Sequence, residues 1–169
     1  SAGSQYAELA EITLSIIWKE VLYEFAKKFG PEPGNGAAVI SMGSLGSGML
    51  HANSDLDLII IYDADGNDQS EGNRSLSARQ YYSRLTKAFI TAISAPMSEG
   101  RLYEIDMRLR PSGFQGPVAT SWSSYQNYQK NEAWVWEHLA LTRARAVAGK
   151  VFLLNEFETF RSSLLKSYN

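Results

Sequence analysis

The sequence predicts a single α/β (α+β) domain in which a mixed sheet is flanked by helices. Three observations predict this class. Short apolar stretches alternate with segments of helical spacing, no repeat or long linker interrupts the chain, and the composition is ordinary for a globular protein. Of the 169 residues, 44% are hydrophobic and 20% are charged, which argues against a disordered or fibrous chain. We therefore expect one domain with a sizeable core.

The first third of the chain is predicted to form one helix and two strands. Apolar residues recur at helical spacing over residues 5–29, and Gly30 and Pro31 then end the pattern. The residues expected to form the buried face are Leu9, Ile12, Ile16, Leu22, Phe25 and Phe29. Residues 37–42 are apolar and followed by glycines, which predicts a strand running into a loop at 43–48. Residues 56–62 are predicted to form the second strand.

The rest of the chain is predicted to alternate in the same way. Residues 63–73 are polar and glycine-rich, which predicts a surface loop, and Asn73 or Ser75 would cap a helix over 76–95. A third strand is expected over 102–109 and an extended piece over 117–120. Further helices are expected over residues 121–130, 132–145 and 151–165.

These elements divide the expected domain into three parts. Residues 1–35 form a leading helix, residues 36–120 the sheet core that carries the candidate site, and residues 121–169 a helical extension. The small polar residues at the start resemble a cut inside a longer polypeptide. We therefore expect the chain to be a fragment of a larger multidomain protein.

Charge and composition narrow the classes of function. A formal net charge of -2 argues against a partner with a long phosphate backbone, so no nucleic acid is expected. The absence of cysteine excludes disulfide frameworks and thiolate metal sites, and with no secretory-type leader this fits a cytoplasmic protein. No apolar run approaches the roughly 20 residues that span a bilayer, so no membrane partner is expected.

Two aspartates stand at the start of the second predicted strand. Residues two apart in a strand face the same side, so Asp55 and Asp57 point together while Leu56 and Leu58 point to the opposite, buried side. Two carboxylates this close repel each other unless a cation lies between them. Mg²⁺ takes oxygen ligands and commonly uses one or two carboxylates together with substrate phosphates. The alternative is that both aspartates cap the preceding loop and face water.

The third predicted strand would add another carboxylate. Alternation places four charged residues on one of its faces: Glu104, Asp106, Arg108 and Arg110. Asp106 beside the first pair would complete a site for two metal ions in a phosphoryl or nucleotidyl displacement, or would act as a general base. Arg108 and Arg110 would neutralise phosphate charge. The alternative is a half-exposed strand with cross-strand ion pairs.

A glycine-rich loop precedes the aspartates. Gly43, Gly46 and Gly48 would let the backbone approach a ligand closely. Ser44 and Ser47 offer hydroxyl and amide donors to a phosphate. We expect Gly43, Ser44 and Ser47 to contact nucleotide.

The ordered pattern of Gly43-Ser44, then Asp55-Leu56-Asp57, then Asp106 resembles the nucleotidyltransferase superfamily of DNA polymerase β. Longer strings are similar to the bifunctional glutamine synthetase adenylyltransferase/adenylyl-removing enzymes of bacteria. These strings, which lie within residues 39–149, are NSDLDLIIIYD, LYEIDMRLRPSG, GPVATS and YQKNEAWVWEHLALTRAR.

The resemblance implies a polymerase β-like fold and an enzyme that moves AMP from ATP to a tyrosine hydroxyl of glutamine synthetase. It also implies that Asp55, Asp57 and Asp106 hold Mg²⁺, and that a PII signalling protein acts through the full-length chain. RLRPSG and NEAWVWEHLALTRAR look like the carboxy-terminal, adenylylating copy of the domain. The alternatives are the deadenylylating copy, which would release ADP from AMP-tyrosine, and a nucleotide-binding fragment that does no chemistry. Uridylylation of a signalling protein fits the superfamily but not the long strings.

The loop departs from the family pattern. Ser44 stands where the family usually has a basic residue, and Gly48 and Met49 replace a later basic and acidic pair. The loop thus has two fewer positive charges to face phosphates, which puts nucleotide affinity in question.

Other candidate ligands are weaker. Residues 63–74 are spaced like a calcium loop, but Arg74 stands where the bidentate glutamate belongs. His138 is expected to be a hydrogen-bonded structural residue, since only His51 could share a metal with it. Arg143 and Arg145 would lie nearly opposite each other on a helix, so neither is assigned to the site.

Overall fold

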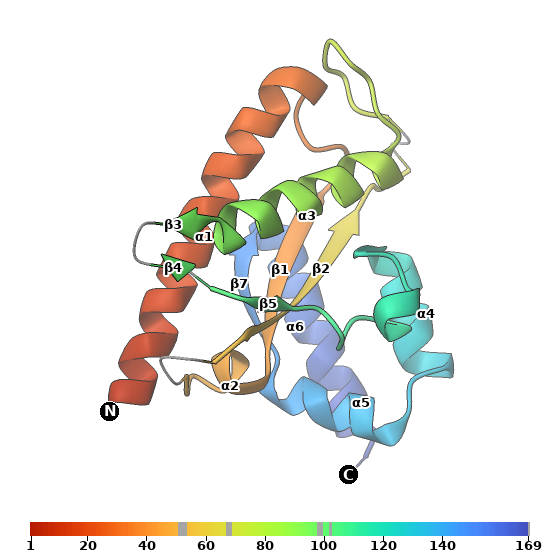
Figure 1. The fold of residues 1–169 in the computed structure, drawn as a ribbon. Coiled ribbons are helices and arrows are strands. Elements are labelled where there is room, and N and C mark those ends of the chain that lie inside the picture. Colours follow the sequence, from red (N-terminus) through yellow and green to blue (C-terminus); the bar gives the residue numbers. More distant parts are fainter. Residues whose placement is uncertain (51–53, 67–68, 98–99, 102, 169) are drawn as a thin grey trace.

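Five strands form one mixed sheet in the order β5, β2, β1, β7, with β6 also paired to β2 (Figure 1). The computed structural model describes residues 1–50, 54–66, 69–97, 100–101 and 103–168. Strand β1 (Gly36–Met42) lies antiparallel between β2 (Leu56–Asp63) and β7 (Arg145–Gly149). Strand β2 is parallel to β5 (Ile105–Asp106) at its start and to β6 (Ala119–Ser121) at its end.

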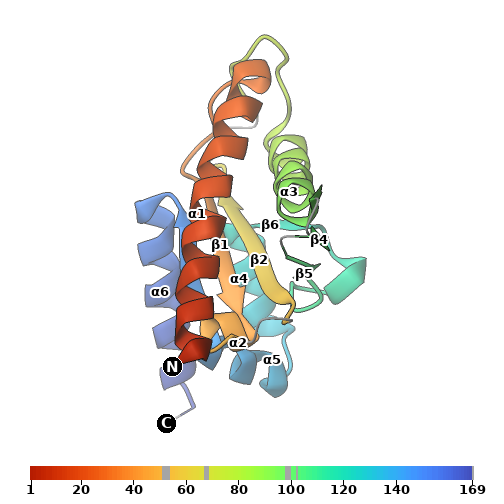
Figure 2. The same ribbon diagram turned by 60° about the vertical axis from the view of Figure 1, so that its left-hand side comes forward.

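Helices cover both faces of this sheet. Helices α1 (Ala2–Phe29) and α3 (Ala78–Ser94) pack on one face, and α4 (Trp122–Asn131) and α6 (Val151–Lys166) on the other (Figures 1 and 2). The smaller elements are α2 (Gly43–Gly46), β3 (Pro96–Met97), β4 (Gly100–Arg101), η1 (Gly113–Gln115), α5 (Val135–Ala140) and η2 (Leu141–Arg143). The predicted mixed sheet flanked by helices is confirmed. None of the described helices combines the length and the apolar character that crossing a bilayer requires.

The core consists of two hydrophobic layers that share the sheet. Successive residues of β1 point to opposite faces, so Val39 packs in the layer of α1 and α3 while Ile40 packs in the layer of α4 and α6. In the first layer the rings of Trp18 and Phe89 meet edge to face, with centroids 5.0 Å apart. Because both faces are buried, the central strands are mostly apolar rather than alternating, with Ser41 in β1 and Asp57 and Asp63 in β2 as the exceptions.

Helix α1 ends where the sequence predicts but begins three residues earlier, and its first half buries a different face. The hydroxyl of Ser1 caps the helix, and Gly30, at a φ of 85°, ends it. Its buried residues are Ala7, Ala10, Leu14 and Trp18. The predicted apolar residues of the first half, namely Leu9, Ile12 and Ile16, are instead 51–62% exposed.

Two predicted elements are wrong. The strand expected over 102–109 is strand only at Ile105–Asp106, because the amide of Arg108 turns back to Asp106 Oδ1 at 2.9 Å. Leu102, where that strand was predicted to begin, lies outside the described residues. The helix expected over 132–145 ends early, and Arg145 begins β7, which pairs with the otherwise open edge of β1.

Two local predictions also need correction. The expected loop at 43–48 contains the single helical turn α2. Helix α3 is capped by the hydroxyl of Ser77, which accepts a hydrogen bond from the amide of Gln80 at 3.2 Å, rather than by Asn73 or Ser75.

Candidate functional site

The predicted aspartates gather at the start of β2. Asp57 faces Met42 of β1 across one edge and Asp106 of β5 across the other. Asp55 is exposed and immediately precedes the strand. Because β2 and β5 are parallel and in this register, the two carboxylate-bearing positions are nearest neighbours across the sheet. The structure thus brings together the acidic residues that the sequence predicts.

Crowding of negative charge is evident at Asp57. Burial is the main cause that raises the pKa of its carboxyl group, and the charges of Asp106 and Asp55 raise it further. The guanidinium groups of Arg108 and Arg143 act in the opposite direction. The balance remains unfavourable to a charged Asp57, so the cluster has a shortage of positive charge.

Arg108 occupies both oxygens of Asp106. Its backbone amide donates to Oδ1 at 2.9 Å, and its Nε lies 2.8 Å from Oδ2. The carboxylate of Asp106 is only 15% exposed, whereas the Arg108 side chain is 66% exposed and can leave without disturbing the core. The guanidinium therefore takes the place next to Asp106 that a metal ion or a substrate phosphate would need.

The donor set fits a hard divalent cation, although it is not assembled as a closed site. In the described portion of the chain, no three acidic or histidine side chains converge closely enough to hold a metal. The three aspartates nevertheless offer only carboxylate oxygens, which suit Mg²⁺. The excess negative charge at Asp57 and the arginine cation on Asp106 both indicate a position that favours a cation.

Helix α2 follows β1 directly and lies against Asp57. A Cβ atom at Gly43 would stand 2.3 Å from Asp57 Oδ2, so only glycine allows this approach, and its φ of 59° also favours glycine. Ser44 is half-buried, and its carbonyl accepts hydrogen bonds from the Ser47 hydroxyl at 3.0 Å and the Met49 amide at 2.9 Å. Contacts of Gly43, Ser44 and Ser47 with nucleotide remain predictions.

Arg143, which the sequence did not assign to the site, lies beside it. Its Nη2 donates to the Ser47 hydroxyl at 3.3 Å, and its charge lowers the pKa of Asp57. A Cβ at Gly46 would lie 1.8 Å from the carbonyl oxygen of Arg143, so α2 packs directly on the backbone of η2. The alternation of residues 145–149, with small residues at 146 and 148 and glycine at 149, was the signal that the preceding helix ends early.

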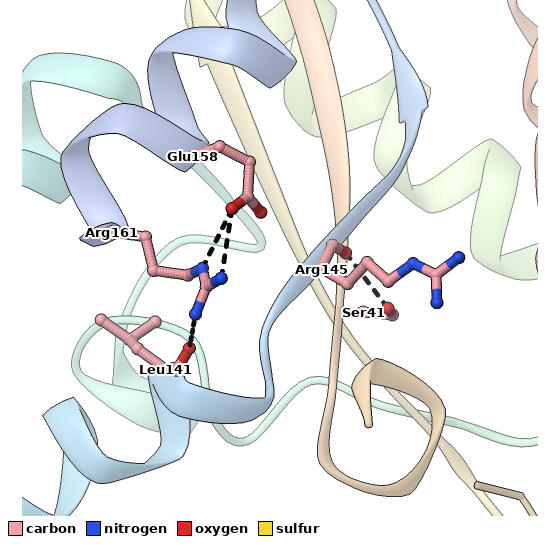
Figure 3. Close-up of polar contacts among 5 residues, drawn as sticks. All are labelled: Ser41, Leu141, Arg145, Glu158 and Arg161. Carbon is pink, nitrogen blue, oxygen red and sulfur yellow. Dashed lines mark hydrogen bonds and ion pairs between the residues drawn. The ribbon is translucent and has the colours of Figure 1, made fainter. Parts of the chain in front are cut away.

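The backbone on both sides of Arg143 is held by side chains from different elements (Figure 3). Arg161 of α6 donates to the carbonyl of Leu141 at 3.0 Å and pairs with Glu158 at 3.2 Å. Ser41 of β1 donates its hydroxyl to the carbonyl of Arg145 at 3.1 Å. Arg143 therefore projects from a fixed segment.

The remaining charged candidates contact groups other than the three aspartates, and phosphate neutralisation by Arg110 stays a prediction. Arg110 is buried, and its guanidinium donates to the carbonyls of Met107 at 3.0 Å and Gly116 at 3.3 Å, so it fixes the turn after β5. Arg145 pairs with Glu11 of α1 at 3.0 Å. His138 is confirmed as a structural residue, with Nε2 2.7 Å from the carbonyl of Gln129 and Nδ1 bonded to the Tyr168 hydroxyl. His51 lies outside the described residues.

Comparison with known proteins gives a consistent result. Residues 3–159 match the family model of glutamate-ammonia ligase adenylyltransferase. Similar proteins named bifunctional glutamine synthetase adenylyltransferase/adenylyl-removing enzyme occur in Mesorhizobium japonicum and Agrobacterium fabrum. They are 45% and 46% identical over 97% of this chain and 17% of their own length. The protein of the same name from Brucella suis is 48% identical over 88% of this chain and 15% of its own. The chain thus spans about a sixth of the length of the curated relatives it matches.

Proposed function

Because the chain belongs to the glutamate-ammonia ligase adenylyltransferase family, we propose that it is a nucleotidyltransferase domain that moves AMP from ATP to a tyrosine hydroxyl of glutamine synthetase. One structural observation carries this proposal. Asp57 and Asp106 are register neighbours on β2 and β5, with Asp55 beside them and a glycine turn packed on Asp57. A carboxylate cluster short of positive charge, next to a close backbone approach, suits a nucleoside triphosphate that arrives with a cation.

In this proposal Asp55, Asp57 and Asp106 hold Mg²⁺. When bound, the ion would neutralise phosphate charge and lower the pKa of the attacking tyrosine hydroxyl. Arg108 would leave Asp106 and pair with a phosphate of ATP, since one guanidinium satisfies either anion. Ser47 and Arg143 would position the phosphates from the α2 side. The tyrosine oxygen then bonds to the α-phosphorus while the bond to pyrophosphate breaks.

The proposal is tested by incubating glutamine synthetase with α-labelled ATP, with and without Mg²⁺. The protein should transfer label only when Mg²⁺ is present, and Asp57→Asn should abolish the transfer. Asp57→Asn should also unfold at the same or a higher temperature, because the raised pKa of Asp57 means that its charge destabilises the fold. Asp65→Asn, in an exposed loop, is the matched control and should retain activity. Near-normal turnover by Asp57→Asn would refute the metal assignment.

A second candidate, removal of AMP, is favoured by the name of the relatives, which gives both activities. The same carboxylates would then serve phosphate attack on AMP-tyrosine with release of ADP. Supplying adenylylated glutamine synthetase with phosphate, and the unmodified enzyme with ATP, separates the two reactions. Binding of ATP without either reaction would instead indicate a nucleotide-binding fragment. We also propose a cytoplasmic location and a PII signalling protein as a partner of the full-length chain.

A further inference from the structure

An open groove of about 540 Å³ runs between α3 and the segment from Arg110 to Ala119. Four of its lining residues are cationic: Arg79, Arg84, Lys87 and Arg110. Among the described residues, no aspartate or glutamate lines the groove, so the three aspartates of the candidate site lie outside it. The groove is therefore separate from the acidic cluster, and its charged lining residues are basic although the net charge of the chain is -2.

The cations that α3 supplies are not paired with acidic side chains in the described part of the chain. Arg79, Arg84 and Lys87 are exposed, and across the described ranges none of them forms an ion pair. Arg84 and Lys87 stand three residues apart on the helix, a spacing at which like charges repel. A helix face of this kind costs stability in the isolated chain, and an anion bound in the groove would remove that cost.

The opposite wall is fixed and carries an aromatic ring. Arg110 is anchored by the carbonyls of Met107 and Gly116, and its guanidinium lies 5.5 Å from the ring centroid of Phe114. Phe114 is 73% exposed at the groove. The groove thus combines a row of exposed cations on one side with an anchored guanidinium and an exposed aromatic ring on the other.

We infer that this groove binds an extended acidic segment of a partner protein. From Arg79 to Lys87 the helix rises about 12 Å, which is too long for one phosphate group and matches several carboxylates along a peptide. An exposed phenylalanine beside Pro117 and Val118 suits an apolar side chain within such a segment. Three exposed cations are too few for a nucleic acid that must be held against physiological salt. This inference does not depend on the activity proposed above.

Fluorescence anisotropy with a short fluorescein-labelled glutamate peptide that carries one central phenylalanine tests the inference. The triple variant Arg79→Gln, Arg84→Gln, Lys87→Gln should raise the Kd by about tenfold or more, with a weaker salt dependence. The control triple Lys19→Gln, Lys28→Gln, Lys166→Gln removes the same charge from exposed positions of α1 and α6 and should leave the Kd unchanged. An equal loss in both triples, or no binding by the unmodified protein, would overturn the inference.

Two further arms identify the ligand class. Phe114→Ala should weaken binding of this peptide but not of the same peptide with alanine at its centre. Inorganic phosphate and a short single-stranded RNA serve as competing ligands. The peptide assignment is wrong if the triple variant in the groove abolishes binding of phosphate or RNA but leaves the Kd of the peptide unchanged. The groove would then bind that other ligand. Because no arm measures AMP transfer, these outcomes are independent of whether the carboxylate site is active.

Discussion

At the scale of single residues, the candidate site depends on Gly43, because there is no room for a Cβ atom at this position. Gly43 has no Cβ, and Asp57 Oδ2 occupies the space where one would lie. The carboxylate of Asp57 therefore lies directly against the backbone of α2 at Gly43. The glycine is therefore required for two reasons, its positive φ and its contact with Asp57.

A comparison of Gly43→Ala with Gly48→Ala distinguishes the effect of the positive φ from the effect of the contact with Asp57. Both glycines have positive φ, of 59° and 75°, but a Cβ at Gly48 would meet nothing within 4 Å. Each substitution should cost about 1 kcal/mol of stability through backbone strain, measured by urea unfolding. Only Gly43→Ala should also displace Asp57 and lower kcat for AMP transfer by about 100-fold. Equal activity of the two variants would show that the contact with Asp57 does not matter.

Arg143 supplies positive charge that the loop itself lacks. Ser44 and Gly48 stand where the resemblance places basic residues, and Arg143 lies on the Ser47 hydroxyl from a distant part of the sequence. Arg143→Gln should raise KM for ATP by about tenfold, equivalent to about 1.4 kcal/mol, with a smaller effect on kcat. Arg74→Gln removes an exposed cation from the loop before α3 and should leave both constants unchanged. An unchanged KM in Arg143→Gln would remove this residue from the site.

At the scale of elements, the connection from α1 to β1 is tied to α3 by two tyrosines. The Tyr81 hydroxyl donates to the carbonyl of Gly30 at 2.7 Å, and the Tyr82 hydroxyl donates to the carbonyl of Pro33. Both phenols are buried, and burial raises the pKa of each above its ordinary value. These bonds satisfy carbonyls that follow the end of a helix and have no partner within it.

Tyr82→Phe should lower the free energy of unfolding by about 1–3 kcal/mol, because the carbonyl of Pro33 loses its donor in a buried place. The folded protein holds the Tyr82 proton more tightly than the unfolded chain does. Its contribution to stability is therefore complete below the ordinary phenol pKa near 10 and is lost as the pH rises above it. The variant should accordingly lose less stability than the parent between neutral and alkaline pH. Tyr6→Phe, at an exposed position, should change neither quantity.

The elements also show how far the sequence could predict the structure. The central strands and the long helices were predictable because apolar runs and helical periodicity depend on local spacing. The buried face of α1 was not predictable from spacing, because the alanines at positions 7 and 10 are buried while the larger apolar residues at positions 9, 12 and 16 are exposed. The proximity of the three aspartates was predictable, because it follows from the positions of these residues on neighbouring strands. The position of Arg143 was not predictable in this way, because it depends on β7 pairing with β1, at least 104 residues earlier in the sequence.

At the scale of the whole molecule, the two hydrophobic layers depend on one sheet. Val39 and Ile40 are adjacent in β1 yet belong to opposite layers, so neither layer can separate without exposing the other face of the same strand. Both layers contain fully buried aromatic rings, including Phe89 in one and Phe157 in the other. We expect the two layers to unfold together.

Phe89→Leu and Phe157→Leu test this expectation. Each should lower the free energy of unfolding by about 1–2 kcal/mol, and each should show one transition with the same midpoint by far-ultraviolet and near-ultraviolet circular dichroism. Phe152→Leu, which changes an exposed ring on α6, is the control and should leave the midpoint in place. Two separate midpoints in either buried variant would show that the layers are independent folding units.

The hydrogen bonds that hold the backbone on both sides of Arg143 have a consequence for how the candidate site forms during folding. The carboxylates come from β2 and β5 and are partly countered by Arg108, whereas Arg143 comes from a segment fastened by Ser41 of β1 and Arg161 of α6. A folding intermediate with α1 and α3 packed on the sheet but α6 still detached would present the acidic cluster without Arg143. In such a species only Arg108 would counter the repulsion at Asp57, so the candidate site would gain its second countercharge when α6 packs.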